Sequence, residues 1–398
     1  MIGLSWRLWS GTSRVPRVPF VAGMPALPGF LNEALAAALV GTILLAGWRR
    51  KWVGWFGASV GLAVWMAAND QERFQPWIYQ YAMTGLMFAV LGEREGLKYA
   101  RWWFAAVYFH SGMSKLDVSF CDELGPVFLK AAMTPFGVDV GAWPFWEQTL
   151  AALAMPAWEV VVAVTLVVPK ARRWGRLGAV MIHLGLMGIL GPLGLGHSAI
   201  VILWNAAMAA EVWLLFGKEI AYKVEKWNWL RSVVKGVFWA GVLLPIGERW
   251  GVFDAWPSHA LYASHVERVS VLLHESELAL YPETVRSHLR EAEGPWRLLD
   301  LNGWSRAERG TPVYPGNRAS AGLAEGLAAR YGGRLVRVIA FGPADRWTGQ
   351  RRRVDVIGRE AIGRLGEGFR FNARPTLDSP PGAAGNGLQG SIELSPRG

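Results

Sequence analysis

The sequence predicts an all-α polytopic membrane helix bundle of about eight transmembrane helices, followed by a small C-terminal α+β extracytoplasmic domain. Apolar residues make up 52% of the 398 positions, only 18% are charged and 23 are Trp, a composition far from that of an ordinary soluble domain. The apolar residues concentrate before position 250. The basic residues there lie in short clusters between apolar runs, so the net charge of +10 indicates membrane topology and not nucleic-acid binding.

Eight apolar runs before position 250 are each long enough to cross a bilayer with some tilt. They are residues 31–48, 52–68, 76–91, 100–114, 147–168, 177–193, 198–216 and 233–249. We therefore assign 31–250 to a transmembrane domain. Residues 1–30 lack the continuous apolar core of a signal peptide and are expected to lie at the membrane interface.

The residues after position 250 have the pattern of a small soluble α+β domain over 251–375. Alternating apolar residues predict strands at 269–273 and 335–340, and the Ala/Leu-rich stretch 319–331 predicts a helix between them. The final stretch, 376–398, is rich in Gly, Pro and Ser and is expected to be disordered.

Lys and Arg are distributed unevenly over the connections between the apolar runs. The connections after the first, third, fifth and seventh runs contain 15 of them, and those after the second, fourth and sixth contain 3. Positively charged loops remain in the cytoplasm. The sequence therefore predicts that both termini and the C-terminal domain lie on the extracytoplasmic side.

A dense polar loop at 69–79 joins the second and third runs. Its candidate substrate-binding residues are Asp70, Arg73, Gln75, Trp77 and Tyr79. On the predicted topology they surround the outer mouth of the bundle. The alternative is a solvated turn in which Trp77 and Tyr79 anchor the chain at the interface.

The end of the fourth run carries three candidate catalytic residues, His110, Lys115 and Asp117. Ionisable groups at membrane depth are costly and usually face a protein interior or a cavity. Burial disfavours the ammonium form of a lysine, which makes Lys115 a candidate general base. Gly112 allows a helix or a ligand to approach closely. The alternative is a lysine that extends to the outer interface beside Asp117.

The later runs contain further polar residues that are unusual in an apolar setting: Glu159, His183, His197 and Asn205. An unpaired carboxylate in hydrocarbon is expensive, and a histidine partner would offset that cost. We therefore interpret Glu159 and His183 as a possible buried pair that binds substrate with His197 and Asn205. The alternative is that each histidine is a hydrogen-bonded core residue.

Several kinds of chemistry lack their motif in this sequence. The single Cys121 excludes dithiol chemistry within the chain. There is no HExxH, CxxC, GxGxxG after a strand or Walker loop. The spacing of His259, His265, His274 and His288 is too loose for a metal site, and we interpret them as surface or core residues. We expect no metal and no nucleotide.

The segment that contains the candidate lysine resembles a known family. It has the order Tyr108-Phe109-x-Ser111-Gly112-x-x-Lys115-Leu116-Asp117. This resembles the segment around the catalytic lysine of vitamin K-dependent γ-carboxylases and their bacterial relatives, the horizontally transferred transmembrane (HTTM) family. The loop at 70–77, the stretch 183–205 and the stretch 253–268 also resemble bacterial members, so the resemblance covers about residues 30 to 275.

The resemblance implies a bacterial protein of the inner (cytoplasmic) membrane that binds a reduced quinone, menaquinone or vitamin K-like. Lys115 would act as base on the quinol, with His110 and Asp117 tuning it. In the carboxylases the quinol then reacts with oxygen and gives the base that removes a proton from glutamate. Ser114 stands where they have a second lysine, and the tail is shorter than their substrate-binding domain. The resemblance thus implies quinone handling more than glutamate carboxylation.

Two other functions remain open. A non-catalytic accessory subunit similar to DoxX or MauE-type membrane proteins would use the tail to dock a periplasmic protein or peptide, although MauE-type redox roles usually imply paired cysteines. A transporter or lipid-binding scaffold is less favoured, because the sequence lacks paired broken helices in two matched halves. The expected partners are therefore the lipid bilayer, a quinone and a periplasmic protein or peptide, without nucleic acid.

Overall fold

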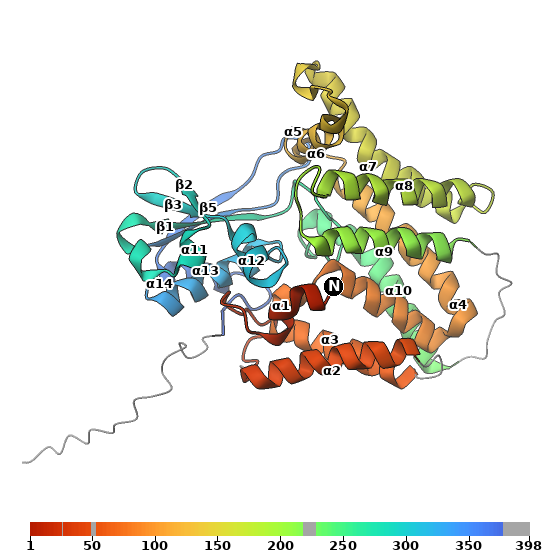
Figure 1. Cartoon of the computed structure of the whole chain (residues 1–398), viewed down its shortest axis with the longest axis horizontal. Helices are drawn as coiled ribbons and strands as arrows, with labels where there is room; N and C mark the ends of the chain where they lie inside the picture. Colours follow the sequence, from red (N-terminus) through yellow and green to blue (C-terminus); the bar gives the residue numbers. More distant parts are fainter. Residues whose placement is uncertain (26, 49–52, 218–227, 377–398) are drawn as a thin grey trace, which may run out of the picture.

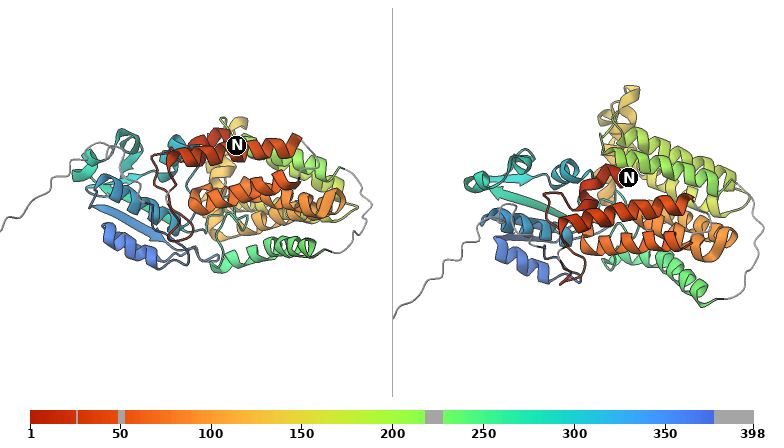
Figure 2. Two further views of the ribbon diagram at one scale, coloured as in Figure 1. Left: turned by 90° about the horizontal axis from the view of Figure 1, so that it is seen from below. Right: turned by 60° about the horizontal axis from the view of Figure 1, so that its bottom comes forward.

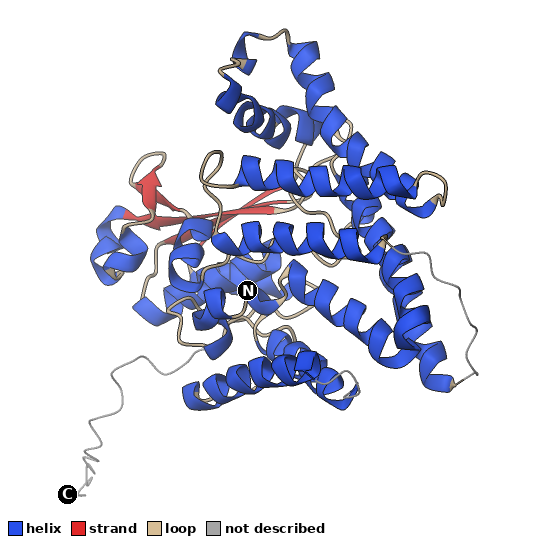
Figure 3. Cartoon of the chain, turned by 45° about the vertical axis from the view of Figure 1, so that its right-hand side comes forward, coloured by secondary structure: helices blue, strands red, loops and turns tan. Residues whose placement is uncertain are grey.

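The computed structural model describes the whole chain except residues 26, 49–52, 218–227 and 377–398. Long helices gather on one side of the molecule, and a five-stranded sheet lies on the other (Figure 1). Colouring by secondary structure shows that the described strands are confined to this second side (Figure 3). We call the two sides the helical part, from residues before 250, and the sheet part, mainly from residues after 265.

Long helices build the helical part. They are α2 (Gly29–Trp48), α3 (Val53–Asn69), α4 (Pro76–Ser114), α7 (Phe145–Val167), α8 (Arg172–Leu190), α9 (Ala199–Leu215) and α10 (Trp229–Leu243). The short elements are η1 (Gly3–Ser5), α1 (Trp6–Ser10), η2 (Gln71–Arg73), α5 (Val118–Asp122), α6 (Leu124–Met133), η3 (Thr134–Phe136), η4 (Val140–Ala142) and η5 (Leu244–Trp250). Pro76 begins α4, where the missing N–H of a proline costs no helical hydrogen bond.

The element α4 is a helical hairpin that a glycine interrupts. Gly92 has φ 77° and ψ 177°, which is not helical and which only glycine adopts readily. Beyond it, a Cβ on Gly96 would lie 3.0 Å from the carbonyl oxygen of Met87. Residues nine apart in a continuous helix are separated by about 13 Å, so the chain folds back at Gly92. The predicted runs 76–91 and 100–114 are the two arms of this hairpin.

The prediction of an all-α bundle of about eight transmembrane helices is wrong. Among the described residues, three helices are long and apolar enough to cross a membrane by length and composition: Gly29–Trp48, Phe145–Val167 and Trp229–Trp250. The helices Val53–Asn69 and Ala199–Leu215 are apolar but shorter, at about 25 Å each. Counting apolar runs overestimated the number of membrane-crossing helices, because the count included helices as short as these.

Charged residues also exclude three of the predicted runs, 76–91, 100–114 and 177–193, from the set of candidate crossings. The hairpin α4 carries Glu93, Arg94 and Glu95 beside its break, and α8 begins with two arginines, Arg172 and Arg173. A charge held in the hydrocarbon core of a bilayer is costly, so charges at these helix ends shorten the apolar length that is available for a crossing. A run of apolar residues is therefore not sufficient to predict a crossing when the helix that contains it also carries such charges.

The helical part exposes many large apolar side chains. Exposed examples are Phe30, Leu44, Trp48, Phe145, Trp146, Trp158, Trp174, Met181, Leu193, Leu214, Trp229 and Trp250. The sheet part exposes fewer, namely Leu280, Leu335, Trp347, Ile357 and Phe371 among the described residues. Soluble monomers rarely expose large contiguous apolar areas, so the surface of the helical part is suited to an apolar environment.

The sheet is antiparallel throughout, in the order β2-β3-β1-β4-β5. Its strands are β1 (Arg268–His274), β2 (Leu289–Glu291), β3 (Trp296–Leu299), β4 (Val336–Phe341) and β5 (Arg353–Ile357). The predicted strands 269–273 and 335–340 are confirmed by β1 and β4. In β4 the buried residues Val336, Val338 and Ala340 alternate with half-buried ones, as expected of a strand with one face on a core.

Helices cover one face of this sheet. The elements are η6 (Glu275–Leu280), α11 (Glu283–Arg286), α12 (Leu301–Arg309), α13 (Asn317–Tyr331) and α14 (Arg359–Glu367). The predicted helix 319–331 is confirmed by α13, which packs on β1 and β4, while α14 packs on α13 and β5 (Figure 2). The buried Trp304 of α12 joins the core between sheet and helices.

The N-terminal segment completes the core of the sheet part. Val15 and Val18 are buried in the same cluster as Leu323 of α13, and the Val18 carbonyl accepts a hydrogen bond from Gln71 N at 2.9 Å. We expected residues 1–30 at a membrane interface. The structure packs Val15 and Val18 on the sheet part and buries Trp9 fully, and the interfacial position of 1–30 stays a prediction. The predicted disordered tail, 376–398, lies outside the described residues beyond Thr376.

Candidate functional site

An internal cavity of about 80 Å³ lies among α4, α7, α8, α9 and the loop residues Leu261 and Tyr262. We call it the Lys115 cavity. Its polar lining is Tyr108, Ser111, Lys115, Glu159, His183 and Asn205, and its apolar lining includes Phe120, Phe128, Leu186 and Met208. Four residues that the sequence singled out, Lys115, Glu159, His183 and Asn205, thus come from four different helices or their ends to one cavity.

Lys115 is held by an ion pair and by carbonyl groups. Its Nζ lies 3.0 Å from Glu159 Oε2 and donates to Ser111 Oγ and Ser111 O, both at 2.7 Å. A fourth contact, at 3.3 Å, reaches the carbonyl oxygen of Leu261. The residue is only 5% exposed, so the alternative of a lysine extending to an interface beside Asp117 is wrong.

A close approach of two helices positions this ion pair. A Cβ on Gly112 of α4 would lie 2.7 Å from Pro156 O and 3.1 Å from Glu159 Cβ of α7. Only glycine leaves room at this distance. Pro156 lies inside α7 and lacks the N–H that continues the helical hydrogen bonds. The expectation that Gly112 lets a neighbouring helix approach is confirmed.

Replacing Gly112 with alanine should therefore push α4 and α7 apart and disturb the Lys115–Glu159 ion pair. We expect a loss of about 1–3 kcal/mol of stability, because the new methyl group overlaps the α7 backbone, and a longer Lys115–Glu159 separation. Thermal unfolding of the purified variant measures the first effect. Gly188→Ala is the matched control, since a Cβ at this α8 glycine meets no atom within 4 Å. Equal losses for both variants would contradict the packing argument.

A chain of hydrogen bonds forms the opposite wall of the Lys115 cavity. Asn205 Nδ2 donates to Val201 O at 2.9 Å, which turns Asn205 Oδ1 toward His183 Nδ1 at 2.8 Å. His183 therefore donates from Nδ1, and its Nε2 accepts from the Tyr108 hydroxyl at 2.6 Å. The expected Glu159–His183 pair is wrong, because Glu159 pairs with Lys115 and His183 bonds to Tyr108 and Asn205.

This arrangement is suited to proton transfer. One proton moved over the 3.0 Å from Lys115 Nζ to Glu159 Oε2 converts the ion pair into an amine and a carboxylic acid. An amine at this place can accept a proton from a hydroxyl group in the cavity. The Tyr108 hydroxyl, directed to His183 as donor, leaves its oxygen lone pairs free for such a substrate.

The two residues expected to tune Lys115 lie elsewhere. His110 Nε2 bonds to Val242 O at 2.8 Å, and its side chain lines an apolar groove between α4, α7 and α10 with Phe109 and Ile246. Asp117 caps α5 by accepting from Phe120 N at 2.7 Å. Neither lines the Lys115 cavity, so the expectation that His110 and Asp117 act on Lys115 is wrong in this structure.

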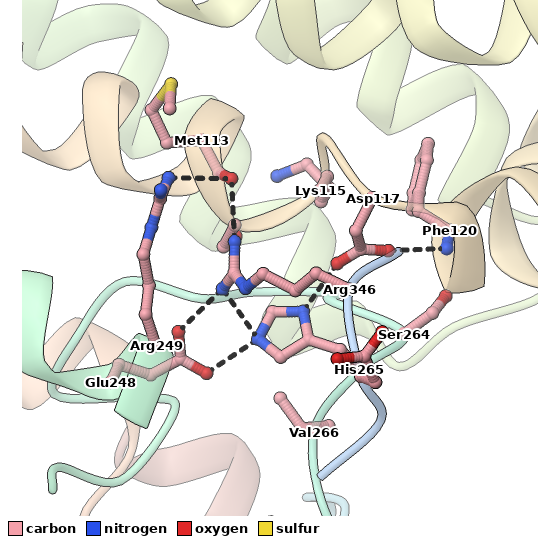
Figure 4. A network of polar contacts seen from close by, with 12 residues as sticks. Met113, Lys115, Asp117, Phe120, Glu248, Arg249, Ser264, His265, Val266 and Arg346 are labelled. Carbon is pink, nitrogen blue, oxygen red and sulfur yellow. Dashed lines mark hydrogen bonds and ion pairs between the residues drawn. The ribbon is translucent and has the colours of Figure 1, made fainter. Parts of the chain in front are cut away.

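Asp117 instead belongs to a buried clamp between the helical and sheet parts (Figure 4). His265 Nδ1 lies 2.7 Å from Asp117 Oδ2, and His265 Nε2 lies 2.7 Å from Glu248 Oε1. Arg346, from the sheet part, approaches Glu248 Oε2 at 3.3 Å. Burial lowers the pKa of His265, but the hydrogen bonds to Asp117 and Glu248 outweigh it and raise the pKa above its ordinary value.

The clamp should make stability depend on pH. Because the pKa of folded His265 is raised, its contribution to stability is fully present below the ordinary histidine pKa of 6.5 and is lost as pH rises through the folded pKa. We expect His265→Asn to lose about 1–3 kcal/mol at pH 6 and clearly less at pH 9. Unfolding midpoints of wild type and variant at both pH values measure this. A pH-independent difference would contradict a charged His265.

The polar loop after α3 is a buried joint and not an open mouth. Asp70, Gln71, Glu72 and Arg73 are at most 2% exposed. Glu72 Oε2 accepts from Tyr314 N of the sheet part at 2.8 Å, and burial raises the pKa of Glu72 to about 7. The expectation that Asp70 and Arg73 bind substrate at an outer mouth is therefore wrong. Tyr79 packs on Phe74 beside this joint, with ring centroids 5.9 Å apart.

The remaining candidates line a second cavity, of about 230 Å³, which we call the junction cavity. Gln75, Trp77 and His197 line it together with residues of α12 in the sheet part. It shares Trp204, Leu261 and Tyr262 with the Lys115 cavity. The two cavities are therefore neighbours, separated by these three side chains.

Comparison with known proteins assigns no family. No family model, curated protein or solved structure matches this chain. The chemistry must therefore be argued from the site itself. Among the described residues, no group of three or more His, Cys, Asp and Glu side chains is placed to hold a metal ion.

Sequence reasoning missed several residues of these sites. Tyr108 lies two helical turns before Lys115, and this spacing places both residues on one face of a helix. The spacing in the sequence could therefore have identified Tyr108 as part of the site. His265 was interpreted as a surface or core residue, and nothing in the sequence relates it to Glu248 or Arg346. These contacts depend on how the helical and sheet parts pack together, and the sequence around each residue does not indicate that packing.

Proposed function

We propose that this chain is a membrane-embedded enzyme that uses Lys115 as the base on the hydroxyl group of a lipid quinol. The observation that carries the proposal is the buried ion pair of Lys115 with Glu159 at a cavity with largely apolar walls. The resemblance of residues 108–117 to the lysine segment of the γ-carboxylase and HTTM family supports the same substrate. We do not extend the proposal to glutamate carboxylation.

The proton route follows from the contacts of Lys115. Glu159 takes one proton from Lys115 Nζ, and the resulting amine accepts the proton of the quinol hydroxyl. The ammonium group then lies beside the quinolate oxygen and stabilises its charge. Tyr108, fixed by His183, is placed to accept or relay a hydrogen bond on the opposite wall. The quinol supplies the electrons, and oxygen is the acceptor that the resemblance implies.

The side chains that line the Lys115 cavity have the chemistry to bind a quinol, but the cavity must enlarge to hold one. Phe120, Phe128 and Leu186 offer apolar walls for a flat ring, and Lys115 and Tyr108 offer polar groups for its oxygens. The Lys115 cavity of about 80 Å³ is well below the roughly 300–1,000 Å³ of common ligand sites. Displacement of Tyr262 would join it to the junction cavity, and we propose that the ring enters in this way.

The proposed membrane setting rests on the surface of the helical part. Three helices are long and apolar enough to cross a bilayer, and large apolar side chains such as Trp48, Phe145 and Leu214 are exposed around them. A lipid quinol is dissolved in the same apolar phase. An enzyme with this surface therefore meets its substrate without extracting it into water.

The test is quinol conversion by purified protein. Menadiol, a tailless reduced menaquinone analogue, is added without oxygen and then exposed to air, and quinol loss and product mass are followed. Lys115→Arg is the critical variant, because arginine keeps the charge beside Glu159 but remains protonated. We expect it to lose about 10²- to 10⁴-fold in rate, as should Lys115→Met.

Lys115→Arg also separates a catalytic role of Lys115 from a structural one. The arginine keeps the ion pair with Glu159, so the fold should be preserved while the base is lost. A protein-free detergent sample gives the rate of spontaneous oxidation. Conversion by wild type at the spontaneous rate, or equal conversion by wild type and Lys115→Arg, would refute the proposal. Either result would leave the alternative of an accessory subunit whose sheet part docks another protein.

A further inference from the structure

The junction cavity has the composition of a binding site for an anion. Its polar lining includes Arg306 and Asn302 of α12, Thr311, and His197 and Ser198 before α9. Among the described residues that line it, none is acidic. Aromatic side chains, Trp77, Trp204, Trp256 and Tyr262, form much of the remaining wall. A charged group and an aromatic body could therefore be bound together.

Two buried polar groups of this cavity have no partner. Thr311 is 1% exposed and Trp77 is 8% exposed. Neither Thr311 Oγ1 nor Trp77 Nε1 makes a hydrogen bond within the part of the chain that the structure describes. A buried polar atom without a partner costs about 1–3 kcal/mol. Both residues line the junction cavity, and a ligand that accepts hydrogen bonds would remove this cost once the side chains turn these atoms toward it.

The positive charge at the cavity is also uncompensated. Arg306 is exposed at its rim and makes no side-chain hydrogen bond or ion pair to the residues that the structure describes. Arg306 and His197 line the same cavity; burial lowers the pKa of His197, and the charge of Arg306 lowers it further. Within the described part of the chain, no side chain supplies a counter-charge at this rim.

The start of α9 adds a third favourable feature. Ser198 is the N-cap of this 17-residue helix, and its side chain makes no capping hydrogen bond. Both Ser198 and Ile200 line the cavity. Free N–H groups and the helix dipole at such an end favour negative charge. The start of a helix alone would not define a binding site. Here it lines the same cavity as Thr311, Trp77 and Arg306.

We propose that the junction cavity binds a small organic monocarboxylate with an apolar or aromatic body. Arg306 is its counter-ion, and Thr311, Trp77 and the start of α9 are its donors. One guanidinium balances one negative charge, which favours a carboxylate over a phosphate dianion. The volume of about 230 Å³ restricts the ligand to a small molecule. That the carboxylate acts as a second reactant beside the Lys115 cavity rests on the proposed function. That the junction cavity binds a carboxylate does not.

Titration calorimetry on the purified full chain tests this proposal with three probes. They are benzoate, the neutral isostere benzamide and inorganic phosphate. We expect wild type to bind benzoate in preference to both others. Arg306→Gln should weaken benzoate binding about tenfold or more, because a charge-assisted hydrogen bond is lost, and Thr311→Val should weaken it severalfold. Arg334→Gln, at another exposed arginine, is the matched control and should change nothing.

Lys115→Arg, which keeps the ion pair with Glu159, separates this inference from the proposed enzyme. Benzoate binding that survives Lys115→Arg and fails in Arg306→Gln supports the site even if no quinol is converted. Absence of benzoate binding by wild type overturns the proposal, as does equal binding of benzamide or an unchanged affinity in Arg306→Gln. Tighter binding of phosphate than of benzoate would overturn the assignment to carboxylates.

Discussion

Removing one charge from the Lys115–Glu159 pair should destabilise the protein more than removing both. The two side chains are 6% and 12% exposed, so either charge alone would remain buried without its partner. We expect Lys115→Met and Glu159→Met each to lose about 3–5 kcal/mol of stability. The double variant Lys115→Met/Glu159→Met should lose less than either, because two neutral side chains leave no buried charge.

Thermal unfolding of the four proteins in one detergent measures this coupling as a double-mutant cycle. The activity assay gives an independent result, since the double variant should be as inactive on menadiol as Lys115→Met. A double variant that combines high stability with wild-type conversion would contradict the role of Lys115 as base. Losses that simply add would show that the two residues do not form a buried pair.

Replacing Arg73 with methionine should be the most destabilising change in the joint between the parts. Arg73 is fully buried and donates to Leu8 O at 3.0 Å, Met66 O at 3.1 Å and Asn32 Oδ1 at 3.3 Å. Methionine fills similar space but leaves three acceptors unpaired. With about 1–3 kcal/mol for each orphaned group, we expect a total loss of about 3–5 kcal/mol.

The control for Arg73→Met is Arg352→Met, at an exposed arginine of the sheet part. Surface substitutions away from special features usually change stability by no more than about 0.5 kcal/mol. Thermal unfolding should therefore show a large loss for Arg73→Met and almost none for the control. Limited proteolysis adds a second readout, since release of Leu8 should expose the N-terminal segment first. Equal midpoints for both variants would contradict a structural role of Arg73.

The sequence predicted part of the candidate site because ionisable residues are rare in apolar runs. Lys115, Glu159, His183 and Asn205 stood out for that reason, and the structure brings all four to one cavity. Their pairing could not be predicted, because it depends on helix rotation and depth. Glu159 lies against Gly112 of α4 and so meets Lys115, while His183 meets Tyr108.

Composition indicated a change of structure near position 250, and local patterns predicted β1, β4 and α13. The number of membrane-crossing helices was wrong, because apolar runs do not reveal the reversal at Gly92 or the effect of charges at helix ends. The loop 70–73 was expected to be exposed because it is polar. It is buried because its charges meet Arg309 and Tyr314, which lie more than two hundred residues away.

The burial of Val15 and Val18 in the core of the sheet part constrains how the chain can be threaded. A segment near residue 18 and a strand near residue 271 share one core, so both must lie on the same side of the proposed membrane. The intervening chain must then pass through the bilayer an even number of times, and three crossings are not allowed. Reporter tags at the two ends of the chain should accordingly be accessible from the same compartment.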